Sequence, residues 1–277
     1  MITYHYTSIN TLFNILSGIK HKPEPNANID DIDFYFLKLH SSNSIFLNDP
    51  TEIELYLEAL LEAFNNNSDL ESVIKSNWFL GTPYVLSFSE LEDDLNMWIK
   101  YADNAQGVAL GFDLNEDIIK EKNNKFDDIQ ILKCEYQTKD KLIKKIKKQD
   151  GYKQIKKDLK NRTVDTEFRI DNILRDVRLN SLRYKNIAYQ SEKEWRLFVF
   201  ADFDSKFKCR KNEIVNYKEV LIPLSALKQI KFAPLTDFNK LNYSVNKFIE
   251  KKTNTCFTCF KKDVKISKSK IPYTSKK

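Results

Sequence analysis

The sequence predicts an α+β fold built on a mixed or antiparallel sheet. Short apolar segments with strand-like alternation, such as residues 84–89 and 107–112, are interspersed with segments whose apolar residues recur at helical spacing, such as residues 9–16. These segments lack the regular strand–helix–strand order that a parallel sheet requires. A chain of 277 residues with 42% hydrophobic content can bury a sizeable core, so we expect a single α+β domain over residues 1–277.

The first elements carry ordinary boundary signals. Residues 4–7 predict a short strand, and Ser8 is placed to cap a helix that ends at Gly18. The buried side of that helix is expected to contain Ile9, Leu12, Phe13 and Leu16. Residues 20–42 are polar and contain two prolines, which predicts a loop with a short element at residues 34–36.

A helix start follows in the segment FLNDPTE at residues 46–52. Asp49 fits the N-cap, Pro50 the first helical position and Glu52 the third. The apolar stripe after it consists of Ile53, Tyr56, Leu57, Leu60, Leu61 and Phe64. A second helix is predicted from Asp69 toward Trp78.

The middle of the chain predicts strands around one helix. Residues 84–89 form a strand in which Ser87 and Ser89 lie on the side opposite Phe88. The pair Asp93–Asp94 then precedes a helix that contains Met97, Trp98 and Tyr101. Residues 107–112 and 129–136 predict two further strands.

The net charge of +6 is unevenly distributed. Residues 139–162 contain 11 Lys or Arg against 3 Asp, and the tail at residues 261–277 contains 7 Lys against 1 Asp, so the remainder is acidic. We expect a basic helical insertion over residues 139–185. Both basic segments could contact nucleic acid or an acidic partner through phosphate or carboxylate groups, and the alternative is a solvated surface.

The segment YQSEKEWRL, followed by FVF, predicts a strand over residues 189–200. With a period of two, Glu192, Glu194 and Arg196 share one face. Two carboxylates leading into a buried strand indicate either a functional site or an ion pair in which Arg196 neutralises Glu194. Strands at 214–222 and 229–234 and a helix at 240–251 complete the chain.

Several classes of protein are not indicated. No segment approaches the roughly 20 apolar residues of a membrane helix, and the N-terminus lacks a signal peptide, so we expect a cytoplasmic protein with reduced cysteines and no membrane partner. Cys256 and Cys259 have metal-ligand spacing, but no nearby His completes a set of four ligands. We therefore predict no metal site.

Six motifs together resemble a known bacterial family. They are HYTS, FLNDPTE, SFS, MWIKYADNAQGVALGF, YQSEKEWRL and SKIPY. This set is similar to the family catalogued as domain of unknown function 2971, DUF2971, and spans nearly the whole chain. The order of three of its elements also resembles the ADP-ribosyltransferase superfamily, with His5, then Ser87-Phe88-Ser89, then Glu192-Lys193-Glu194.

The second resemblance implies NAD as substrate and a role for each residue. Glu194 would stabilise the oxocarbenium-like state beside the ribose, and Glu192 would orient or deprotonate the acceptor. His5 would hold the ribose of NAD. Ser87 would brace Glu194, with Ser89 lying in the same strand motif, and Tyr6 or Tyr101 would stack on the nicotinamide. Arg196 could bind the NAD pyrophosphate or quench Glu194, and Lys185 also lies close in sequence to the two glutamates.

The expected function is therefore NAD-dependent ADP-ribosyl transfer to protein or nucleic acid, as in a toxin or phage-defence effector with a restraining partner protein. One alternative is a non-catalytic module of the same fold that binds a nucleotide or nucleic acid through residues 139–162. Another is a nuclease that holds a divalent metal with Asp49, Glu52, Glu192 and Glu194. The transferase hypothesis predicts that Glu194→Gln removes catalysis with stability nearly unchanged, whereas the ion-pair hypothesis predicts a large loss of stability.

Overall fold

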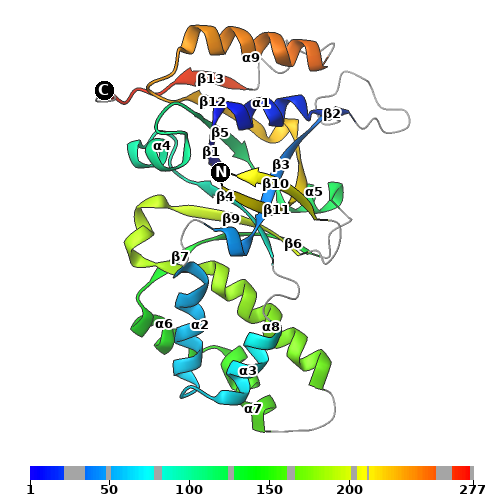
Figure 1. Ribbon diagram of the computed structural model, residues 1–277, viewed down its shortest axis with the longest axis vertical. Helices are drawn as coiled ribbons and strands as arrows, with labels where there is room; N and C mark the ends of the chain where they lie inside the picture. Colours follow the sequence, from blue (N-terminus) through cyan, green and yellow to red (C-terminus); the bar gives the residue numbers. More distant parts are fainter. Residues whose placement is uncertain are drawn as a thin grey trace. The chain divides into compact units, whose positions relative to one another are not determined.

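The computed structural model describes residues 1–21, 35–47, 51–77, 83–123, 128–160, 166–200, 205–210, 212–253 and 264–274. The chain divides into two compact units, drawn in Figure 1 with their helices and strands labelled. Unit 1 comprises Met1–Ser41, Leu86–Gln130 and Glu219–Lys277, and unit 2 comprises Ser42–Val85 and Ile131–Lys218. This division does not test the prediction of a single domain over residues 1–277, which stays a prediction.

A mostly antiparallel sheet forms the centre of unit 1. Its strands are β1 (Ile2–Thr7), β4 (Tyr84–Ser89), β5 (Val108–Asp113), β12 (Leu227–Phe232) and β13 (Lys265–Lys268), and the boundary of the unit divides β4 after Val85. Hydrogen bonding gives the order β4-β1-β5-β12-β13, with β12 and β13 parallel and the other pairs antiparallel. The residue before β5 is Gly107. The position requires glycine because a Cβ there would lie 2.2 Å from the Thr7 carbonyl oxygen.

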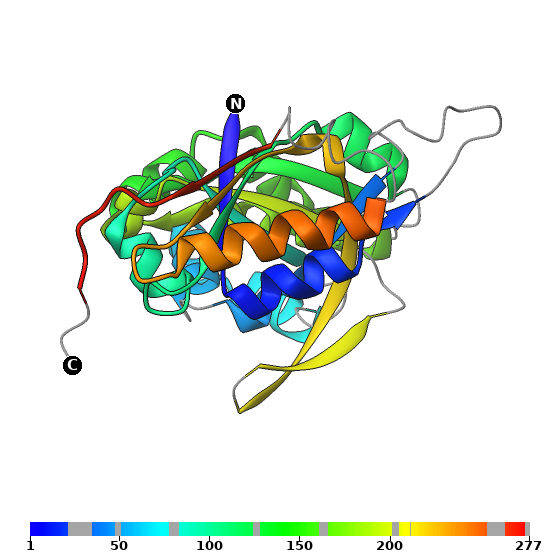
Figure 2. The ribbon, with the colours of Figure 1, turned by 90° about the horizontal axis from the view of Figure 1, so that it is seen from above.

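Helices pack beside this sheet in unit 1. They are α1 (Ile9–Ser17), α4 (Leu95–Tyr101), α5 (Glu116–Lys122) and α9 (Phe238–Thr253), with the short helix η4 (Leu224–Ala226) before β12. Ser8 caps α1 by accepting a hydrogen bond from the Thr11 amide, as predicted. Helices α1 and α9 lie side by side (Figure 2), and the rings of Phe13 and Phe248 are 5.4 Å apart.

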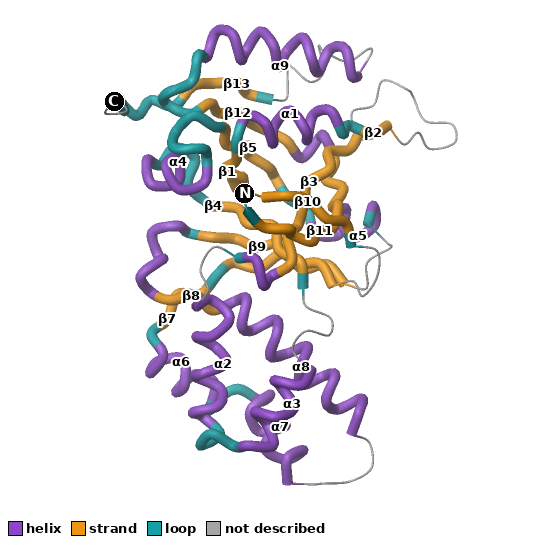
Figure 3. Tube along the Cα trace, viewed as in Figure 1, coloured by secondary structure: helices purple, strands orange, loops and turns teal. Residues whose placement is uncertain are grey.

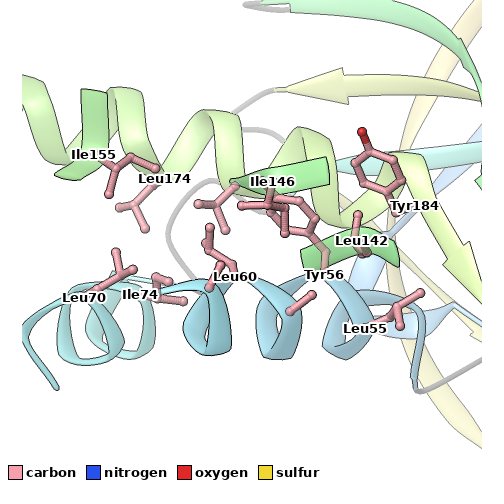
Figure 4. Packing of buried hydrophobic residues seen from close by; sticks show 13 residues of the cluster. Leu55, Tyr56, Leu60, Leu70, Ile74, Leu142, Ile146, Ile155, Leu174 and Tyr184 are labelled. Carbon is pink, nitrogen blue, oxygen red and sulfur yellow. The ribbon is translucent and has the colours of Figure 1, made fainter. Parts of the chain in front are cut away.

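Unit 2 has its own helical core. The helices are α2 (Thr51–Ala63), α3 (Ser68–Asn77), α6 (Lys139–Ile146), α7 (Asp150–Lys160) and α8 (Thr166–Arg183). Figure 4 shows their apolar side chains meeting in one buried cluster. In it the rings of Tyr56 and Tyr184 are stacked, 5.7 Å apart and 8° from parallel. The apolar stripe predicted for the helix after residue 50 lies in this core through Tyr56 and Leu60.

Unit 2 also contains strands and parts of strands, which Figure 3 colours orange. A small parallel pair joins β7 (Glu135–Gln137) to β8 (Tyr184–Asn186), and a hairpin joins β10 (Lys206–Arg210) to β11 (Glu213–Pro223). The helix η3 (Ile187–Glu192) leads into β9 (Glu194–Phe200). Phe198 of β9 packs with Val85 of β4 in a second buried cluster.

The α+β class is confirmed, and several boundaries differ from expectation. Residues predicted as loop contain β2 (Lys20–His21) and β3 (Tyr35–Asn43), preceding the short helix η2 (Ser44–Phe46). Alternate positions of β3 are fully buried from Tyr35 onward, so burial in the sheet outweighs the polar composition. The strand predicted at 129–136 is divided into β6 (Asp128–Lys133) and β7, with Cys134 between them.

Candidate functional site

The segment carrying the two predicted glutamates is not a continuous strand. Glu192 is the last residue of η3, and Lys193 adopts a left-handed conformation with φ of 44° and ψ of 51°. Strand β9 therefore begins at Glu194, and the expectation that Glu192 shares a strand face with Glu194 and Arg196 was wrong. A positive φ breaks the period of two, because it redirects the chain between the two glutamates.

Both carboxylates nevertheless reach the same lysine. The Nζ atom of Lys185 in β8 lies 2.9 Å from Glu192 Oε2 and 2.9 Å from Glu194 Oε2. Arg196 forms a two-pronged pair with Glu194, in which Nε donates to Oε1 at 2.8 Å and Nη2 donates to Oε2 at 2.9 Å. We call Lys185, Glu192, Glu194 and Arg196 the ion cluster.

The ion cluster is buried and electrically balanced. Its side chains are between 1% and 9% exposed, and two cations face two carboxylates. The third guanidinium nitrogen, Nη1 of Arg196, donates to the Leu182 carbonyl oxygen at 2.8 Å. Burying such groups is costly unless each is paired and hydrogen-bonded, and this arrangement supplies those partners.

Neighbouring backbone and aromatic groups fix the cluster in place. The Glu194 amide donates to the Tyr136 hydroxyl at 2.7 Å, and the Glu194 carbonyl accepts from the Cys134 amide at 2.9 Å. In the β7–β8 pair, Tyr136 is opposite Lys185. The Lys185 Nζ atom also lies 4.9 Å from the Tyr189 ring centre. Strands β7 and β8 thus position both the lysine and the start of β9.

Electrostatics keep Glu194 ionised. Burial by itself would raise the pKa of Glu194, but the charges of Arg196 and Lys185 and their hydrogen bonds lower it to about 2. The carboxylate therefore carries its full charge at neutral pH. These contacts match the ion-pair hypothesis for Arg196, whose side chain is 1% exposed, and the pyrophosphate role of Arg196 stays a prediction.

The remaining predicted site residues lie in unit 1. His5 Nδ1 is 3.0 Å from the Ser87 carbonyl oxygen, and since a carbonyl can only accept, Nδ1 carries the proton. Buried Ser89 accepts from the Leu91 amide at 3.1 Å, and Tyr6 donates its hydroxyl to the Leu91 carbonyl at 2.8 Å. Each of these groups thus has a local structural contact. The predicted contact of Ser87 with Glu194 involves different units and stays a prediction.

The rings of Tyr6 and Tyr101 belong to one apolar cluster at the end of β1. Tyr6 packs edge-on against Trp98, with ring centres 4.7 Å apart, and burial raises the pKa of its hydroxyl. Tyr101, the last residue of α4, is partly buried against the same cluster. Tyr101 is therefore less buried than Tyr6.

Sequence reasoning missed a second polar centre in unit 1, formed by Asp93. Its Oδ1 accepts from Trp98 Nε1 at 2.7 Å and from Ser269 Oγ at 2.6 Å, and its Oδ2 accepts from the Lys270 amide at 2.9 Å. Lys231 lies 3.5 Å from Oδ2. We call these contacts the Asp93 latch. The sequence signals were the pair Asp93–Asp94 before a helix and the motif SKIPY, and neither indicated a partner more than 170 residues away.

The structure bears on the metal and membrane expectations only through the residues that it describes. Among the described residues, no group of three or more His, Cys, Asp or Glu is placed to hold a metal ion. Asp49, Cys256 and Cys259 lie outside the described residues, and so does the side chain of Glu52. In the described ranges no helix has the length and apolar character needed to cross a membrane.

These features define a mixed α/β protein with a buried, balanced ion cluster at the start of a strand. The sequence model of the family DUF2971, described as a protein of unknown function, matches residues 97–197. The match confirms the resemblance to this family, and it includes the whole ion cluster but not His5, Ser87 or Ser89. No curated protein and no solved structure matches the chain.

Proposed function

We propose that this protein is an NAD-dependent ADP-ribosyltransferase in which Glu194 acts beside the ribose of NAD. The observation that supports it best is the state of Glu194: an ionised carboxylate held rigidly at the start of β9, two residues after a second glutamate. Cleavage of the bond between ribose and nicotinamide develops positive charge on the ribose. A fixed, ionised carboxylate stabilises that charge.

The hydrogen-bonding pattern of Glu194 is compatible with this role. Its Oε2 accepts from both Lys185 and Arg196, whereas its Oε1 accepts from Arg196 Nε. Since a carboxylate oxygen has two lone pairs, Oε1 can accept a further hydrogen bond from a ribose hydroxyl. In the reaction the electron pair of the broken bond leaves with nicotinamide, the acceptor nucleophile bonds to the ribose carbon, and Glu192 takes its proton.

The unit 1 residues are assigned to binding NAD. His5, oriented by the Ser87 carbonyl, is assigned to the ribose of NAD. Tyr6 or Tyr101 is assigned to the nicotinamide ring, and of these Tyr6 packs against the Trp98 ring and donates its hydroxyl to the Leu91 carbonyl.

A second candidate is a catalytically silent binding module. It is favoured by the burial of Glu194, whose side chain is 9% exposed and paired with two cations. Under this hypothesis the ion cluster only stabilises unit 2. The two candidates differ in one respect that can be measured, namely whether NAD is consumed.

The test is incubation of the protein with labelled NAD and separate pools of protein, DNA and RNA. Wild type is compared with Glu192→Gln, which leaves both cationic partners of Glu194 in place, and with His5→Ala. The matched control is Glu116→Gln, which removes one carboxylate from an exposed pair on α5. We expect label in one pool with wild type and the control, at least tenfold less transfer with Glu192→Gln, and a raised KM for NAD with His5→Ala.

Two results would count against the transferase, and a third would reject only the role of Glu192. Intact NAD in every pool would favour the silent module. Equal transfer by Glu192→Gln would remove Glu192 from the mechanism. Nucleic-acid cleavage that disappears with EDTA, with no label transferred, would favour the nuclease alternative, because ADP-ribosyl transfer needs no divalent metal in this scheme.

A further inference from the structure

The helices α6 and α7 present a dense positive surface. Residues 139–157 contain nine lysines against two aspartates. Three of the lysines have carboxylate partners: Lys139 pairs with Glu58 and Glu62, Lys145 with Glu135, and Lys153 with Asp150. Five more are exposed and pair with no carboxylate among the described residues, and we call them the lysine surface: Lys141, Lys144, Lys147, Lys148 and Lys157.

Repulsion between the like charges of the lysine surface destabilises the segment that carries them. Lys141 and Lys144 lie three residues apart in α6, whose Leu142 and Ile146 are buried, and Lys148 lies in the turn that follows the helix. Like charges at this spacing destabilise an isolated helix. The helix is held by its apolar side, which enters the core of unit 2 (Figure 4). A bound polyanion would relieve the repulsion.

We infer that the lysine surface binds the phosphate backbone of a nucleic acid. Phosphates at regular spacing match a row of ammonium groups, and lysine contacts them as a point charge. A bilayer is disfavoured as the partner because the apolar residues of α6 and α7 are used in the protein core. Base stacking is not part of the contact, since Tyr152 packs on Phe64 at 4.5 Å. The expected contacts are therefore with the phosphate backbone, which carries no sequence information.

The same surface identifies the acceptor class, and this step rests on the proposed function. Lys145 of α6 pairs with Glu135 and lies 4.9 Å from the Tyr184 ring centre. Glu135 and Tyr184 are opposite each other in the β7–β8 pair. The next pair along these strands is Tyr136 and Lys185, which contact Glu194. Helix α6 thus contacts the strands that position Glu194. The acceptor for ADP-ribose is a nucleic acid bound on α6 and α7.

The test measures binding and transfer separately. Binding of fluorescently labelled 20-nucleotide DNA and RNA, single-stranded and duplex, is followed by anisotropy without NAD at several salt concentrations. The variant is Lys141→Gln/Lys144→Gln/Lys148→Gln. The matched control is Lys240→Gln/Lys247→Gln/Lys251→Gln, which removes three charges from exposed positions of α9. Vesicles of phosphatidylserine are the membrane probe.

We expect the α6 variant to weaken nucleic-acid binding at least tenfold at ~150 mM salt and to reduce the slope of log K against log salt by roughly 2 to 3, about 0.9 for each lost duplex contact. The α9 control should change binding less than twofold. Equal losses in both variants would show a response to net charge and overturn the inference. Binding to vesicles but not to nucleic acid would overturn it as well.

The transfer readout separates the two proposals. Label that moves to the nucleic-acid pool with wild type and is lost with the α6 variant supports both. Nucleic-acid binding with intact NAD would reject the transferase and retain the lysine surface. Transfer to the protein pool without nucleic-acid binding would retain the transferase and reject the inference.

Discussion

Glu194 receives three hydrogen bonds from two buried cations, and this arrangement decides what a substitution there will do. Replacing it with glutamine would leave Lys185 and Arg196 with one fewer charge to balance them in a site that water scarcely reaches. We therefore expect Glu194→Gln to lower the free energy of unfolding by about 3–5 kcal/mol. The result is a marked fall in the urea midpoint, as the ion-pair hypothesis predicts from the sequence, whereas the transferase hypothesis predicted nearly unchanged stability.

A double variant and an unrelated single variant provide the controls for this prediction. Glu194→Gln/Lys185→Met removes one charge of each sign, so it should be more stable than Glu194→Gln alone. Glu116→Gln, on the exposed face of α5, should cost no more than about 0.5 kcal/mol. A wild-type urea midpoint for Glu194→Gln would show that the ion cluster contributes little to folding.

Residue spacing predicted part of this site and missed the rest for a definable reason. Arg196 and Glu194 were expected to meet because residues two apart on a strand share a face, and they do. Glu192 was misplaced because the left-handed conformation of Lys193 leaves no signature in the sequence. Lys185 was noted only for its nearness in sequence, since its position depends on the pairing of β8 with β7.

At the scale of elements, the segment after β13 is held to α4 by the Asp93 latch. Asp93→Ala would remove the acceptor for Trp98, Ser269 and the Lys270 amide at once. We expect faster hydrogen exchange of the Lys270 amide and a red shift of Trp98 fluorescence, with a loss of about 2 kcal/mol in unfolding free energy. Asp237→Asn, at an exposed helix start, is the control. Unchanged exchange at Lys270 would reject the latch.

Elements with strong local signals were predicted well, and those that depend on distant partners were not. Helices α1 and α4 and strands β4 and β5 matched because caps and apolar spacing are local. Strand β3 was predicted only as a short element at residues 34–36, because its sequence YFLKLHSSN becomes a longer strand through neighbours far along the chain. The same dependence on partners concealed β13, which pairs with β12.

For the whole molecule, the response to acid follows from its lowered carboxylate pKa values. Burial alone would raise the pKa of Glu194, and Arg196 and Lys185 outweigh burial and lower it from 4.5 to about 2, so the folded state binds fewer protons than the unfolded state in this range. Bonds from Lys231 and Gln229 lower the pKa of Glu92. Burial would raise the pKa of Asp93, but the hydrogen bonds of the Asp93 latch outweigh burial and lower that pKa.

Stability contributed by these groups is complete above their unfolded pKa values and is lost as pH falls. For Glu194 the loss spans pH 4.5 to about 2. We expect the urea midpoint to be level near neutral pH and to fall steeply below about pH 4.5. In Glu194→Gln/Lys185→Met the fall should be shallower, because the carboxylate with the lowered pKa is gone. Equal slopes for wild type and this variant would mean that Glu194 is not the group whose protonation unfolds the protein.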